Sequence, residues 1–353
     1  MNNHSELYIA GMGMITPVGA NVEMTSAFVS SGLSGYQVSE YKNWQCKPIT
    51  MARVPDDAFP EICDELDTSE EMSDQIARMV LMAHLAIEEV MNAYPGTAPL
   101  PLILSGPEID TDLEVPFSSS FFELLAAQSN IAFDRENSRL LGIGRAGVIN
   151  GIDMAFKYLD QGHDYVLVGG VDSHEDYDLL LKLAAQGRIT AEGSSDGFVP
   201  GEAASFLLLT AKKELASIIN GSVLSLSIPG LSHEPGHLKS EATYTGDGLA
   251  ESFKIALTNA DEPLISCVYS SMNGENYWAK EYGVAMIRNS IAEDVIHEHP
   301  ADCYGDIGAA TGAVLISISA LSLAAQKCEK SHLIYTSSDT AYRASIFLKS
   351  SLV

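Results

Sequence analysis

Basic residues are scarce in this chain of 353 residues. Only 20 Lys and Arg stand against 47 Asp and Glu, which gives a formal net charge of −27. Nucleic acids and anionic membranes are themselves negatively charged, so such a surface repels both. We therefore expect no nucleic acid and no membrane surface as a ligand. Solubility is the simpler interpretation of the acidity, and recognition of a basic partner is the alternative.

Cysteine is also sparse, and no two cysteines form a CxxC pair. An odd, scattered set of five indicates reduced thiols rather than a disulfide framework. The opening residues, MNNHSELYIAGMG, lack the basic segment and apolar run of an export signal. We therefore expect a cytoplasmic protein. The five cysteines are Cys46, Cys63, Cys267, Cys303 and Cys328.

Clusters of metal-ligating residues are missing as well. His233 and His237 have a spacing that could hold a metal, but no further ligands gather near them in the sequence. We interpret both as loop residues and expect no metal and no cofactor.

One long stretch, residues 309–326, has no charged residue and is about as long as a membrane span. It nevertheless contains Thr311, Gly312 and three serines, which are polar or small. We therefore predict a helix buried on all sides in a large core, not a membrane span.

Short apolar segments alternate with amphipathic ones along the chain. Helical spacing predicts a helix from about Asn21 and another over residues 72–90, whereas residues 107–135 look irregular. Strands alternating with helices indicate an α/β protein with mixed or parallel sheets covered on both faces. The predicted strands include residues 100–106, 206–210 and 264–271.

A helix followed by an apolar strand occurs twice. Gly147–Gly170 has this pattern, and Gly312–Ser338 repeats it 165 residues later. No Gly/Ser linker or block of charge separates the halves of the chain. The pattern predicts a duplicated α/β unit, with one half at 1–210 and the other at 211–353, joined in one compact body.

Four segments resemble one enzyme family in their order along the chain. They are IAGMGMITPVG (9–19), DYVLVGGVDS (164–173), DGFVPGEAASFLLL (196–209) and GDIGAATGA (305–313). Together they resemble the β-ketoacyl-acyl-carrier-protein synthases. This resemblance implies the thiolase-like fold, a duplicated α/β/α/β/α layered architecture with mixed sheets. In that context Glu202 and Asp196 belong to a structural segment rather than to a catalytic pair of carboxylates.

The same resemblance implies that the catalytic residues of the family are replaced in this chain. In active family members a cysteine accepts the acyl chain, and two histidines support decarboxylation and stabilise the oxyanion. Here Arg145 stands at the cysteine position, Asp306 at the second histidine and Ala301 at the lysine. Met272 is the closest match to the first histidine. The glycine-rich gating loop corresponds to YTSSDTAYRAS (335–345), which has no glycine.

This pattern resembles the chain length factors, the non-catalytic partners of ketosynthases in type II polyketide and aryl polyene systems. The resemblance implies a heterodimer with an active ketosynthase, contact with an acyl carrier protein through that complex, and a shared acyl tunnel. Arg145 departs from the family, where an uncharged residue is common at this position. The alternatives are an acyltransferase or decarboxylase with displaced residues, for which Cys303 or nearby serines are available, and an acyl-binding homodimer.

Two further expectations concern side chains. A buried cation at a helix N-terminus opposes the helix dipole and needs an anion, for which Asp306 is the candidate; otherwise Arg145 reaches solvent or a partner subunit. Three aromatic residues in the irregular stretch are candidates for lining an acyl tunnel, and packing in the core is the alternative. They are Phe117, Phe121 and Phe122.

Overall fold

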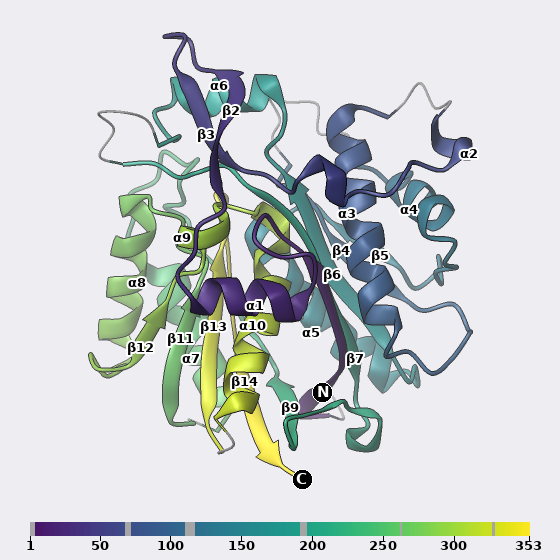
Figure 1. The fold of residues 1–353 in the computed structure, drawn as a ribbon. Coiled ribbons are helices and arrows are strands. Elements are labelled where there is room, and N and C mark those ends of the chain that lie inside the picture. The colour runs from purple at the N-terminus through teal and green to yellow at the C-terminus, as the bar shows by residue number, and fades with distance from the viewer. Residues whose placement is uncertain (1–3, 68–71, 110–116, 191–195, 262, 327–328) are drawn as a thin grey trace.

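The computed structural model describes residues 4–67, 72–109, 117–190, 196–261, 263–326 and 329–353. Within them a mixed sheet of twelve strands runs in the order β12-β11-β13-β14-β9-β1-β7-β6-β4-β5, with β8 paired to β9 and β10 to β14 (Figure 1). The strands of the path are β1 (Glu6–Ile15), β4 (Leu102–Ser105), β5 (Arg139–Leu141), β6 (Val166–Ser173), β7 (Glu202–Thr210), β9 (Ser222–Ser227), β11 (Ile265–Ser270), β12 (Ile296–Glu298), β13 (Ser331–Ser337) and β14 (Tyr342–Leu352); β8 is Ile218–Ile219 and β10 is Gly230–His233.

Strand pairing is the same in the two parts of this sheet. In the N-terminal part β4 is parallel to β5 and β6, while β7 is antiparallel to β6 and β1. In the C-terminal part β11 is parallel to β12 and β13, while β14 is antiparallel to β13 and β9. The parts meet where β1 runs antiparallel to β9. The duplicated α/β architecture is therefore confirmed, and the boundary near residue 210 stays a prediction.

Helices complete five layers around the two parts of the sheet. The helices α3 (Asp74–Met91) and α4 (Phe121–Ser129) share a core with the outer face of the N-terminal part. On the other side, α7 (Asp247–Asn259) and α8 (Asn276–Arg288) pack on the outer face of the C-terminal part. Between them α5 (Gly147–Asp160) and α10 (Thr311–Ala325) contact strands of both parts (Figure 1).

The apolar stretch predicted to be a buried helix is α10. Among the described residues, the helical segment Gly308–Ala325 is long enough and apolar enough to cross a membrane, but 83% of it is buried inside the fold. Strands β6 and β7 lie on one side of α10, and β13 and β14 on the other. The absence of charge in this helix is thus explained by packing against both parts of the sheet.

The remaining elements lie around these layers. Asn21 and Ser73 cap α1 (Val22–Ser30) and α3 by accepting backbone N–H bonds, as expected for helix starts. The stretch 107–135, predicted to be irregular, contains α4, and its residues 110–116 lie outside the described part. The other elements are the hairpin β2 (Tyr36–Lys42) and β3 (Pro48–Ala52), and the helices α2 (Asp64–Asp67), α6 (Tyr177–Ala185) and α9 (Ala301–Tyr304).

Candidate functional site

The turn that enters α5 carries Arg145. It is a short 3-10 turn, Gly144–Ala146, and Gly144 has a φ of 64°. Glycine adopts this left-handed conformation without strain, so the sequence Gly-Arg at this point lets the chain turn sharply from β5 into the helix. The turn directs Arg145 toward the C-terminal part of the sheet, where η4 (Gly308–Ala310) begins α10 and where β13 ends.

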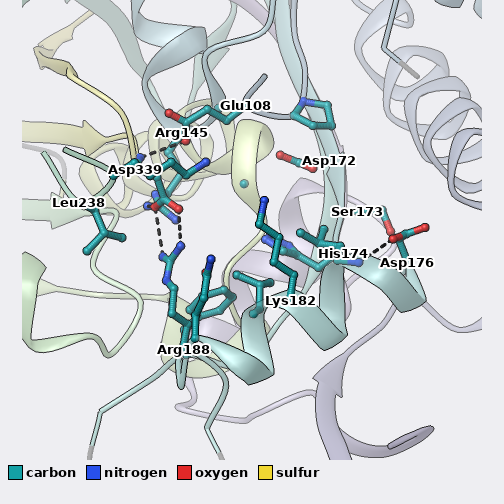
Figure 2. A pocket seen from close by; sticks show the side chains of 18 of the residues that line it. Glu108, Arg145, Asp172, Ser173, His174, Asp176, Lys182, Arg188, Leu238 and Asp339 are labelled. Carbon is teal, nitrogen blue, oxygen red and sulfur yellow. Dashed lines mark hydrogen bonds and ion pairs between the residues drawn. The ribbon is translucent and has the colours of Figure 1, made fainter. Parts of the chain in front are cut away.

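The Arg145 guanidinium is buried, with 7% of the residue exposed. It forms an ion pair with Asp339, which lies beside it in Figure 2. It also forms an ion pair with Asp306 and donates a hydrogen bond of 2.8 Å to the Ser337 carbonyl. It also lies 4.8 Å from the ring centre of Trp278. Burial lowers the pKa of Arg145, but Asp306 and Asp339 outweigh this effect and raise it. Arg145 is therefore a permanent, paired cation that does not extend to the solvent.

Asp306 comes from the C-terminal half and is an ion-pair partner of Arg145; only 3% of it is exposed. Its carboxylate also accepts hydrogen bonds from the Gly308 N–H at 2.9 Å and from the Asn273 side chain at 2.8 Å. Burial raises the pKa of Asp306, but the attraction of Arg145, together with the hydrogen bonds to the carboxylate, outweighs burial, so the net shift of this pKa is downward. The pair that the sequence left open is thus formed in the structure, between the two halves.

Asn273, the residue after Met272, contacts Asp306. Met272 is half-buried and packs against the hydrophobic cluster of α7 and α8. The contact of Asn273 was not predicted, because no recognisable motif between β11 and α8 fixes which residue reaches Asp306. Ala301 begins α9 and is buried in the central core, where its carbonyl accepts a 2.7 Å hydrogen bond from the Tyr36 hydroxyl. The Ala301 side chain offers no group to the network.

A second arginine joins the network from the loop after α6. Arg188 donates two hydrogen bonds to Glu275, at 2.7 and 2.8 Å, and two to Asp339, at 2.5 and 3.2 Å. Asp339 therefore lies between Arg188 and Arg145. Burial raises the pKa of Asp339, but Arg145 and Arg188 more than offset this and hold it well below its usual range. Neither Arg188 nor Glu275 was predicted, and the only signal for Asp339 was its place in the segment aligned with the gating loop.

The turn that carries Asp339 is fixed from several sides. Glu108, just after β4, accepts the N–H groups of Asp339 at 3.1 Å and of Thr340 at 2.6 Å. Burial raises the pKa of Glu108, and the nearby Asp339 adds to the shift. Ser338 donates from its hydroxyl to the Ile143 carbonyl at 2.5 Å and accepts the Ala146 N–H at 3.0 Å. This turn between β13 and β14 is thus bonded to the entrance of α5.

A cavity of about 920 Å³ opens beside this network (Figure 2). One wall carries Arg145, Arg188, Asp339 and Glu108, and the opposite wall is formed by α6. Asp172 also lines the cavity, and its carboxylate accepts the Ala309 N–H at 2.8 Å. Burial raises the pKa of Asp172 to about 6, although His174 and this hydrogen bond act in the opposite direction. Further residues around the cavity include Ser173, His174, Lys182, Phe198 and Lys239.

The arrangement can hold charge, but at position 145 it cannot attack a thioester. The Arg145 guanidinium stays protonated and has no nucleophilic lone pair. Cys303, the thiol nearest in sequence to Asp306, is buried, and burial raises its pKa, which disfavours the reactive thiolate. The four cysteines in the described residues are free thiols, while Cys328 lies outside them. Within the same residues no group of three potential ligands could hold a metal ion.

Other residues singled out in the sequence have structural positions. Glu202 is buried and accepts hydrogen bonds from the Val54 N–H, Ser173 and Arg78, which ties β7 to neighbouring segments. Asp196 accepts the N–H of Asn276 at the start of α8. His233 ends β10, where its ring lies 5.0 Å from that of Tyr342, so it is a strand residue rather than the expected loop residue.

The three phenylalanines pack in the core on the outer face of the N-terminal part of the sheet. Phe121 and Phe122 are buried members of the cluster formed with α3, and the half-buried Phe117 packs against it. The rings of Phe117 and Phe121 lie 4.9 Å apart. None of the three is among the residues that line the cavity beside Arg145. A tunnel shared with a partner subunit stays a proposal for these residues.

No protein-family model matches the sequence, and no curated protein matches it either. Solved structures do match the fold. The ishigamide ketosynthase/chain length factor is similar with a TM-score of 0.76 at 15% identity, over 98% of this chain and 99% of that one. A ketosynthase in complex with its chain length factor from Xenorhabdus doucetiae is similar with a TM-score of 0.76 at 15% identity, over 98% of each chain.

A third similar structure is a type II polyketide acyl carrier protein in complex with its ketosynthase, with a TM-score of 0.71 at 14% identity, over 98% of this chain and 99% of that one. Identities this low establish architecture, because folds persist where activities change. The repeated strand pairing, the five layers and these similarities together show that the chain has the thiolase-like fold of the ketosynthases.

Proposed function

We propose that this chain is a non-catalytic, chain-length-factor-like partner of an active ketosynthase. In this role it stabilises the active subunit and shapes the tunnel that receives the growing acyl chain. The substrate class is a polyketide or polyene chain on an acyl carrier protein, and an aryl polyene system is the specific candidate. Such a complex works in the cytoplasm, in keeping with the free thiols of the described cysteines.

One observation carries the proposal: the position that aligns with the family's nucleophile holds a buried cation with two ion pairs. Arg145 is held by Asp306, Asp339 and the Ser337 carbonyl. A condensing site needs a nucleophile with an adjacent base and donors free to stabilise an oxyanion. Here the carboxylates accept and the guanidinium donates, so the groups satisfy one another. This supports a structural role for the pocket.

The similar structures support the choice of partners. Two of them bear names that include a chain length factor, and the third contains an acyl carrier protein with its ketosynthase. A protein that has lost its own chemistry on this fold gains a function most directly by pairing with a subunit that keeps it. Exposed apolar residues outside the core could take part in such contacts, since obligate interfaces are large and apolar. They include Val38, Trp44, Ile109 and Ile287.

The test is to co-express the chain with a candidate ketosynthase partner from the same organism, carrying an affinity tag on the ketosynthase only. We expect the two chains to co-purify in equal amounts. The complex is then incubated with acyl-loaded carrier protein, and intact-mass analysis shows which chain carries the acyl group. We expect the acyl group on the ketosynthase and none on this chain.

The control replaces the nucleophilic cysteine of the ketosynthase by alanine. This change should abolish all acyl labelling of the complex while leaving co-purification intact. An acyl adduct on this chain, in either complex, would show that it is an enzyme with a displaced nucleophile. Failure to co-purify, with this chain recovered as a stable homodimer, would refute the partnership itself.

A further inference from the structure

The Asp339 carboxylate occupies a position that a free ligand could take. It lies between two arginines that come from different elements, Arg145 at the start of α5 and Arg188 after α6 (Figure 2). Arg188 contacts both of its oxygens, at 2.5 and 3.2 Å, and Arg145 contacts one of them. Planar guanidinium groups around one carboxylate are the usual way in which proteins recognise carboxylate ligands.

We propose that Arg145 and Arg188 form a binding site for a small carboxylate, and that the side chain of the chain's own Asp339 fills this site in the structure. The site faces the cavity of about 920 Å³, because both arginines and Asp339 line it. A molecule in that cavity therefore reaches the arginines as soon as Asp339 moves away. This property belongs to the chain alone and does not depend on a ketosynthase partner.

The remaining contacts of the two arginines keep the site in shape without Asp339. Arg145 is still anchored by Asp306 and the Ser337 carbonyl, and Arg188 is still anchored by both oxygens of Glu275. Each guanidinium thus retains its orientation and presents the N–H groups that Asp339 leaves. Buried donors without acceptors are unfavourable, so a carboxylate that replaces Asp339 should be bound.

Nearby charges set the strength of this binding. Lys239 lies on the same cavity and lowers the pKa of Asp339, so it favours an anion there. Glu108 lines the cavity as well, and its mutual repulsion with the Asp339 carboxylate opposes an anion there. Asp339 is tethered close to the arginines, and tethered groups act at effective concentrations of the order of millimolar. A free carboxylate should therefore bind weakly while Asp339 is present, and measurably more tightly once it is removed.

The experiment measures the melting temperature of the full chain with Asp339→Ala, titrated with sodium acetate. We expect the variant to melt below the wild type and to regain much of the difference as acetate rises. Sodium chloride at the same ionic strength, and neutral acetamide, should not restore it. The matched control is Asp178→Ala, which removes an exposed acid of α6 on the same cavity and should show no response specific to acetate.

A second variant shows which residues bind the acetate. Asp339→Ala combined with Arg188→Gln should lose the response to acetate, because one of the two guanidinium groups is gone. Should Asp339→Ala fail to accumulate as folded protein, its refolding yield in acetate and in chloride becomes the measurement, and a higher yield in acetate supports the site. Equal effects of acetate and chloride on Asp339→Ala, or an acetate shift in the wild type or in Asp178→Ala as large as that in Asp339→Ala, would overturn the proposal.

Discussion

Replacement of Arg145 by methionine should strongly destabilise the protein. The change keeps a side chain of similar length but leaves the Asp306 carboxylate buried, with 3% exposed, and without its cation. Removing one partner of a buried ion pair costs about 3–5 kcal/mol. At about 2 °C per kcal/mol for a protein of this size, the melting temperature should fall by roughly 6–10 °C.

A double-mutant cycle separates the ion pair from the general effect of the substitution. Asp306→Asn keeps an acceptor for the Gly308 N–H, so Arg145→Met combined with Asp306→Asn should recover much of the lost stability. We expect a coupling energy of about 2 kcal/mol or more, in the range of residues that interact directly. The control is Lys157→Met on α5, the helix that follows Arg145. It breaks the exposed ion pair with Asp153 and should cost less than about 0.5 kcal/mol.

The effect should also depend on pH in a defined direction. In the wild type Arg145 holds the pKa of Asp306 below its usual value, so the pair contributes fully at neutral pH and its contribution is lost as the pH falls through that lowered pKa. In the variant burial acts without Arg145 and raises the pKa of Asp306, so acidification relieves the penalty. The difference between the two proteins should therefore shrink toward acid pH. A loss below about 1 kcal/mol, additive in the cycle and constant with pH, would refute the reasoning.

Three further changes have expected outcomes. Arg145→Cys should not give condensation activity in the presence of acyl and malonyl carrier proteins, because Asn273 and Asp306 are not histidines and catalytic groups act as a unit; turnover near that of an active ketosynthase would contradict this. Asp172→Asn should raise the stability at pH 8 by up to about 3 kcal/mol, because burial raises the pKa of Asp172 to about 6 and so disfavours its charged form above that pH. The gain should disappear as the pH falls to about 4, which melting curves across this range can check. Phe121→Ala should lower the free energy of unfolding by about 3–5 kcal/mol, since the ring is buried in the core with α3. It should leave product length unchanged in a reconstituted complex, whereas a longer product from a folded variant would place the ring in the tunnel.

The elements of the fold could largely be predicted, because each rests on a local pattern. Helical spacing places α1 and α3, and the repeated helix and strand units correspond to α5 with β6 and to α10 with β13. The failure at α4 has a physical reason. Its nine residues include two adjacent phenylalanines and begin without a side-chain cap, so neither the periodicity nor the start signal of a helix is clear.

The site was less predictable, because its residues meet only through the tertiary structure. Arg145 and Asp306 were found from motifs that flank them directly. Arg188 and Glu275 lie in segments with no such motif. Asn273, which contacts Asp306, was not predicted, and the alignment of Met272 with the first histidine stays a prediction. Ion pairs across 161 and 194 residues leave no local signal at all.

These long separations have a consequence for the protein while it is being synthesised. Arg145 and Arg188 leave the ribosome first, and their partners Glu275, Asp306 and Asp339 follow. At about 5–20 residues per second, roughly 8–30 s pass between the appearance of Arg188 and that of Asp339, 151 residues later. The partners appear in the order Glu275, Asp306 and Asp339, and α10 lies between the last two. Until Glu275 and Asp306 emerge, the nascent N-terminal half therefore holds two arginines without the anions that pair with them in the folded protein, and it stays exposed to misfolding during that time.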